Sequence, residues 1–104
     1  MKYLQYGYSL PHFHHFVWAF FFSNEMVFQW IYGIGEKTKP TLTFPKTLNK
    51  VFTIFPSFIN AEGSENLHIS TYTTSSVTVF QGAYGAASAN IEKGIEYNIL
   101  IIGI

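Results

Sequence analysis

Residues 67–80 read LHISTYTTSSVTVF, and they contain two runs in which apolar and polar side chains alternate. In the first run Leu67, Ile69 and Thr71 fall on one face of an extended chain, because successive side chains of a strand point to opposite faces. Residues 76–80 repeat the alternation with valine and threonine, which favour strands. A period of two in both runs predicts two β-strands.

Four more runs are rich in branched and aromatic residues and end at a glycine or a proline, which is typical of strands. They are residues 26–32, 41–44, 51–55 and 95–102. Pro45 and Pro56 are expected to end the second and third runs, since proline cannot donate to a β-ladder. No stretch has a helical period with caps at both ends. The sequence therefore predicts an all-β fold, a small antiparallel β-sandwich of about six strands.

A chain of 104 residues is long enough for one domain. Residues 1–24 are aromatic without a clear period, and we expect them to form a separate N-terminal segment, with the β-sandwich in residues 25–104. The apolar run 16–22 follows a single lysine, which leaves a targeting or anchoring segment open as an alternative. This run is shorter than the roughly 20 residues that cross a bilayer, so a membrane-spanning segment is not expected.

The ionisable residues exclude several classes of function. Six lysines balance six glutamates, and the chain has no arginine, aspartate or cysteine. Nucleic-acid binding is not expected, because it needs a basic patch. Without cysteine or aspartate the usual catalytic triads and zinc clusters are missing, so we predict no enzymatic activity and no cofactor. Hydrophobic residues make up 48% of the chain and charged residues 12%, which predicts self-association.

An ordered series of short motifs resembles the C-terminal domain of bacteriophage tail fibres. Val27-Phe28-Gln29-Trp30 is similar to the opening of that domain, and Thr41-Leu42-Thr43-Phe44-Pro45-Lys46 to the strand that follows it. A strand over 51–56, a Thr/Ser-rich strand over 73–79 and the ending Leu100-Ile101-Ile102-Gly103-Ile104 come next, in the order of the family. The resemblance covers about residues 25–104. It departs from the family after Trp30 and after the threonine pair, where glycine is usual.

The resemblance implies a small β-sandwich similar to the H-type lectins. Such domains assemble as homotrimers at the distal tip of the fibre and bind a receptor on the host surface, a glycan or a protein. In that interpretation the protein is part of the virion, and residues 1–24 are either the end of a fibre shaft or a segment without an assigned role. Two alternatives stay open: a structural trimerisation or cap domain without a ligand, and a small secreted or membrane-anchored protein.

Candidate ligand-binding residues come from the expected loops 60–66 and 82–90, because loops carry binding while strands hold position. Tyr84 is the first candidate, since an aromatic ring among small residues can stack on the apolar face of a sugar. The further candidates are Asn66 and Asn90, from the same loops, and Tyr72, at the end of a predicted strand. His68 stands alone on its strand face and is expected to be structural.

His12 and His14 are the candidate metal ligands. On a strand their spacing places both on one face, and imidazole binds iron and zinc. In a homotrimer, two histidines from each of three chains would supply six nitrogens. A single motif of this kind matches many unrelated sequences, so we expect these histidines to be exposed members of an aromatic stretch, with no metal bound.

Overall fold

The computed structural model describes residues 3–10, 15–22, 26–61, 65–82 and 89–104, with side chains from Met26 onward. Every helix or strand described there is a β-strand, as the sequence predicts. The strands are β1 (Tyr3–Leu10), β2 (His15–Phe22), β3 (Val27–Ile34), β4 (Thr41–Thr43), β5 (Val51–Phe58), β6 (Asn66–Tyr72), β7 (Ser76–Gly82) and β8 (Glu96–Gly103). In this part of the chain no helix is long and apolar enough to cross a membrane.

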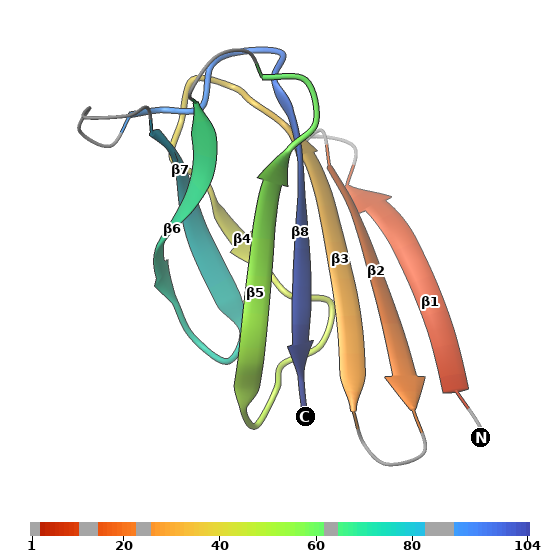
Figure 1. Cartoon of the computed structure of the whole chain (residues 1–104). Helices are drawn as coiled ribbons and strands as arrows, with labels where there is room; N and C mark the ends of the chain where they lie inside the picture. The colour runs from red at the N-terminus through yellow and green to blue at the C-terminus, as the bar shows by residue number, and fades with distance from the viewer. Residues whose placement is uncertain (1–2, 11–14, 23–25, 62–64, 83–88) are drawn as a thin grey trace.

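The strands form two antiparallel sheets. The larger sheet has the order β1-β2-β3-β8-β5, and the smaller has the order β4-β7-β6. Figure 1 shows the smaller sheet as a second layer beside the β5 side of the larger one. The chain changes sheet after β3, β4, β5 and β7. These crossings tie the two layers together as a β-sandwich, which confirms the predicted fold class.

All six predicted strands are present, as β3 to β8. The expected total of about six was too low, because β1 and β2 lie within residues 1–24 and extend the larger sheet beyond β3. Their sequences lack the alternation that marks a half-buried strand: β2 reads HFVWAFFF, with apolar residues at consecutive positions. Whether residues 25–104 fold without these two strands stays a prediction.

Pro56 does not end the third predicted strand. β5 continues through it to Phe58, and Pro56 lies opposite Ile99 of β8. β5 is the edge strand of the larger sheet, with β8 as its one partner there. An edge strand tolerates proline because one of its sides makes no ladder hydrogen bonds.

The core lies between the two sheets and follows the period of two. Alternate residues of β3, β7 and β8 are buried, and the others face away from the core. The buried apolar residues are Val27, Ile31, Leu42, Phe44, Leu48, Leu67, Val77, Val79, Ile91, Tyr97, Ile99 and Ile101. Each sheet thus has one face in the core and one face turned outward.

Tyr97 fills a space left by a glycine on the neighbouring strand. Gly33 of β3 lies directly opposite Tyr97 of β8. A Cβ atom at position 33 would fall 2.7 Å from Cε2 of the Tyr97 ring and closer still to its Cζ. The end of the ring that carries the hydroxyl therefore lies against the Gly33 position, and 3% of Tyr97 is exposed. Burial, and secondarily the charge of Glu36, raises the pKa of Tyr97 to about 12.

This raised pKa predicts a loss of stability at alkaline pH. A tyrosine in the unfolded chain ionises near pH 10, whereas folded Tyr97 keeps its proton to about pH 12. The stabilisation is therefore complete below pH 10 and is lost as the pH rises from 10 to 12. We expect Tyr97→Phe to remove roughly 2–3 kcal/mol of this loss. Urea unfolding of both proteins at several pH values measures it, and identical pH dependence would contradict the prediction.

Candidate binding surface

The outward face of the smaller sheet carries a stacked pair of aromatic rings. His68 of β6 lies opposite Phe80 of β7, and their ring centroids are 5.3 Å apart with an angle of 18° between the planes. His68 is exposed and Phe80 is half-buried. Both belong to the face that alternates with the buried positions Leu67 and Val79. The two rings thus stack on each other on the outward face, and the imidazole is the more exposed of the two.

Gly82, the last residue of β7, lets the histidine ring lie against the sheet. A Cβ atom at this position would come within 2.7 Å of Cδ2 and 2.9 Å of Nε2 of His68. A side chain larger than hydrogen would push the imidazole away from the backbone and from Phe80. The stacking of His68 on Phe80 therefore requires glycine at position 82. Gly82 also lies opposite Asn66, the first residue of β6.

Amide side chains border the ring pair at one end of the smaller sheet. Asn66 is exposed and shares the outward face with His68, two residues further along β6. Asn90 is exposed as well, and its two neighbours are bridged to other parts of the chain. Ala89 and Gln81 exchange backbone hydrogen bonds of 2.8 and 3.0 Å, and Ile91 bridges to Thr38.

The buried side chain of Gln81 adds a further hydrogen bond between β7 and the segment that carries Asn90. Its side chain is 4% exposed, and its Oε1 accepts a hydrogen bond of 3.0 Å from the backbone N–H of Glu92. The segment that carries Asn90 is thus tied to β7 by main-chain and side-chain bonds. Asn66 and the ring pair therefore belong to strands, whereas Asn90 lies outside the strands, between two bridged residues.

Hydroxyl groups continue the outward face beyond the rings. Thr78 precedes Phe80 by two residues on β7, and its Oγ1 lies 2.7 Å from Oγ1 of Thr41 on β4. Hydroxyl and amide groups both donate and accept hydrogen bonds. The surface thus combines an aromatic platform with neutral polar groups, the combination that binds a sugar ring: its C–H face stacks on aromatic rings, and its hydroxyls bond to amides.

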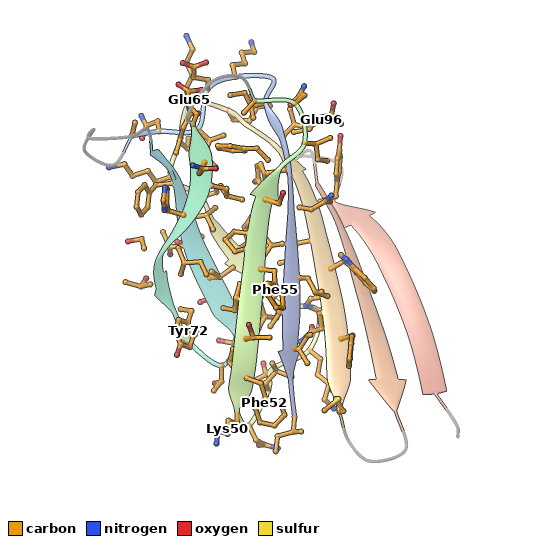
Figure 2. The ribbon with its side chains drawn as sticks, viewed as in Figure 1. Lys50, Phe52, Phe55, Glu65, Tyr72 and Glu96 are labelled. Carbon is orange, nitrogen blue, oxygen red and sulfur yellow. The ribbon has the colours of Figure 1, made fainter. Side chains whose placement is uncertain are left out.

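The structure separates the predicted site residues. Asn66 and Asn90 belong to the same end of the smaller sheet, whereas Tyr72, 57% exposed, ends β6 at the opposite end. Six residue steps along a strand place Tyr72 about 20 Å from Asn66. Figure 2 shows Glu65 beside the start of β6 and Tyr72 at its far end. Tyr72 therefore does not share a site with the asparagines.

Three predicted residues lie outside the described part of the chain: Tyr84, His12 and His14. Among the described residues no group of three histidine, aspartate or glutamate side chains could hold a metal ion.

Sequence reasoning missed the partnership of His68 with Phe80. The alternation in residues 67–72 places His68 on a polar strand face, but the identity of its neighbour depends on the register between β6 and β7. The signal available in the sequence was Gly82, a small residue two positions after an aromatic one. We expected His68 to stand alone on its strand face. In the structure its ring stacks on Phe80.

The motifs that resemble tail fibres serve the scaffold. Gln29 is fully buried, its Nε2 donates a hydrogen bond of 3.0 Å to the carbonyl of Lys46, and its Oε1 accepts one of 2.7 Å from the Lys46 N–H. The Gln29 side chain thus pairs with the Lys46 backbone as a neighbouring strand would, and joins residues 27–30 to the end of residues 41–46.

Neither a protein-family model nor a curated protein matches this chain.

Proposed function

We propose that this chain is a non-enzymatic binding domain of the kind that forms the tip of a phage tail fibre, and that it recognises a glycan on the host surface. The observation that supports the binding role is the His68–Phe80 ring pair, exposed on the outward face of the smaller sheet and bordered by Asn66, Asn90 and Thr78. The order of the motifs over residues 25–104 supports the fibre assignment.

The geometry suits a shallow, reversible contact. The ring pair lies on an open sheet face, so a sugar ring would cover His68 and Phe80 on one side and remain hydrated on the other. One aromatic contact of this kind contributes on the order of 1 kcal/mol. Attachment would then depend on several copies binding together, because linked sites multiply a weak affinity. A fibre that carries several identical tips meets this condition, and the resemblance implies three.

The proposal is tested by removing one exposed ring at each end of β6. His68→Ala takes away half of the ring pair, whereas Tyr72→Ala removes another exposed ring four residues further along β6, about 13 Å away. We expect His68→Ala to weaken attachment to host cells by at least about fivefold per site, in line with one lost stacking contact. Tyr72→Ala should bind as the unchanged protein does, and both variants should keep its melting temperature. Binding of purified protein to candidate host bacteria, and to their isolated polysaccharides, measures the effect.

Tyr84→Ala extends the test to the segment between Gly82 and Ala89. If Tyr84 contributes to the same site, its loss should weaken attachment as much as the loss of His68. Full attachment by both His68→Ala and Tyr84→Ala, with loss only in Tyr72→Ala, would move the site to the other end of β6. Full attachment by all three variants would remove the smaller sheet from recognition.

A structural domain without a ligand is the second candidate, and an observation on the other sheet favours it. The outward face of the larger sheet includes three large apolar side chains that are more than a third exposed: Trp30, Phe52 and Phe55. A lightly charged chain with such a face is suited to assembly. Assembly through the larger sheet and binding through the smaller sheet use different faces, so the two roles are compatible.

A further inference from the structure

Hydroxyl groups form two rows across the outward face of the smaller sheet, next to the ring pair. In the first row, Thr78 of β7 lies directly opposite Thr41 of β4 and Thr71 of β6. In the second row, Ser76 of β7 lies opposite Thr43 of β4. Residues that are directly opposite in adjacent strands share a face of the sheet. These five residues, the hydroxyl rows, therefore continue the face that begins with the two rings.

A β-bulge in β6 completes the first of the hydroxyl rows. The register between β6 and β7 shifts after Ile69, where Ser70 is an extra residue. Thr71 therefore lies opposite Thr78, and Tyr72 lies opposite a buried valine of β7. Without the extra residue, Tyr72 would lie opposite a serine and its ring would share the outward face with the hydroxyl rows. The bulge thus gives the row a third threonine and keeps a large ring away from it.

The three strands of the smaller sheet contain no lysine and no glutamate. Their sequences are TLT, NLHISTY and SVTVFQG, in which His68 is the one basic residue. Glu65, Glu92 and Lys93 belong to the connections and not to these strands. A charged ligand that is covered by protein loses hydration and needs an opposite charge to replace it. Strands without lysine or glutamate therefore favour a ligand that is itself neutral.

The hydroxyl rows can both donate and accept hydrogen bonds. Oγ1 of Thr41 and Oγ1 of Thr78 lie 2.7 Å apart, and either one can be the donor. Because a hydroxyl has one donor site and two acceptor sites, the pair keeps one free O–H and can present it from either side chain. Thr41 and Thr71 are exposed, and Thr78 is half-buried. The hydroxyls of a sugar also donate and accept, so they can bond to this row in either sense.

We propose that the ligand of the smaller sheet is a neutral polysaccharide whose chain lies along β7, with one sugar unit on the ring pair and the next units on the hydroxyl rows. This inference rests on the proposed glycan recognition and names its substrate class. β7 runs between β4 and β6 (Figure 1). From Ser76 to Gly82 it extends over about 20 Å, whereas β4 and β6 are about 10 Å apart. A chain of several sugar units therefore finds more of the face along the strands than across them.

This ligand is compatible with a trimeric fibre tip. A polysaccharide along β7 covers the smaller sheet, and the outward face of the larger sheet stays available for assembly. Each sugar unit beyond the first adds hydrogen bonds to the hydroxyl rows, and one such bond strengthens binding about three- to tenfold. The affinity of a single tip therefore increases with the length of the polysaccharide until the hydroxyl rows are covered.

Competition with surface polysaccharide from a host bacterium tests the neutral class. Anion exchange separates the polysaccharide into a neutral and an acidic fraction, and each is added while the purified full chain attaches to the cells. We expect the neutral fraction to compete, and attachment to be nearly equal at low and high salt, because salt screens only contacts between charges. Competition by the acidic fraction alone, or loss of attachment at high salt, would overturn the neutral class and leave glycan recognition in place. If neither fraction competes, glycan recognition fails and this inference fails with it.

Fragments of the neutral fraction, sorted by length, test the position along β7. Thr78→Val keeps the branched shape and removes the central hydroxyl, so it should weaken the binding of long fragments about three- to tenfold and change that of the shortest ones little. Thr71→Val, at an exposed position of the same row, should do the same. His68→Ala should weaken the binding of fragments of every length.

Thr53→Val is the matched control for these variants. Thr53 is half-buried like Thr78, but it belongs to β5 of the larger sheet. This variant should bind fragments of every length as the unchanged protein does. Equal affinity for short and long fragments, or full binding of long fragments by both Thr78→Val and Thr71→Val, would overturn the position along β7. A loss in His68→Ala alone would then leave glycan recognition at the ring pair in place.

Discussion

Gln29→Leu is expected to lower the free energy of unfolding by about 2–3 kcal/mol. Leucine has a similar volume to glutamine and can fill the buried position, so the loss comes from hydrogen bonding. The N–H and carbonyl of Lys46 would both lose their partner, Oε1 and Nε2 of Gln29. A buried polar group without a partner costs about 1–3 kcal/mol. Urea unfolding at neutral pH measures the change.

Gln81→Leu is the matched control for this variant. Gln81 is nearly as buried as Gln29, but its side chain accepts one hydrogen bond, from the Glu92 N–H. We expect a loss of about 1 kcal/mol, less than half of the loss at Gln29. Equal losses in the two variants would show that the burial of the amide decides the loss of stability, and not the two hydrogen bonds between Gln29 and the Lys46 backbone.

Gly33→Ala is expected to cost about 3 kcal/mol, at the upper end for the insertion of one carbon into a packed site. The new methyl group would overlap the Tyr97 ring, and this ring is 3% exposed, so it can move aside only by displacing core residues or by turning out into solvent. In a Tyr97→Leu background the ring is gone, so the same substitution should cost less than about 1 kcal/mol. The difference between the two backgrounds measures the coupling of the two residues.

Gly94→Ala separates this steric effect from the general cost of replacing a glycine. Gly94 has a φ of +87°, and a Cβ atom there would meet nothing within 4 Å. Its replacement should cost about 1 kcal/mol from backbone conformation alone. If Gly33→Ala costs no more than Gly94→Ala, the close packing of Tyr97 on Gly33 is wrong.

The strands of residues 25–104 were predictable because each buries one face. Burial of alternate residues places an apolar side chain at every second position, as in Val77 and Val79 of β7 and in Tyr97, Ile99 and Ile101 of β8. β2 carries no such pattern, because aromatic residues occupy consecutive positions. The extension of β5 through Pro56 could not be predicted either. A strand tolerates proline only at the edge of a sheet, and the sequence of β5 does not show whether it is an edge strand.

The candidate surface was predictable in part. Asn66 and Asn90 were identified from their place beside the expected loops, and the structure brings them to one end of the smaller sheet. Tyr72 was a candidate as an aromatic ring able to stack on a sugar, and it lies at the other end of β6. Each residue of a strand lies about 3.3 Å further along the sheet than the one before it. The six positions between Asn66 and Tyr72 therefore correspond to the full length of β6. The His68–Phe80 pair depends on the register between two strands, which alternation within each strand leaves undetermined.

The two outward faces of the sandwich point in opposite directions, and this decides what a pair of molecules can reach. Two copies joined through their larger sheets would hold their smaller sheets on the far sides of a four-layer stack. Their ring pairs would look away from each other, so both could not rest on one flat membrane or cell wall. Such a pair would bridge two particles and clump cells in suspension. Copies fixed side by side along a fibre would instead settle together on one cell, and a simple agglutination assay tells the two behaviours apart.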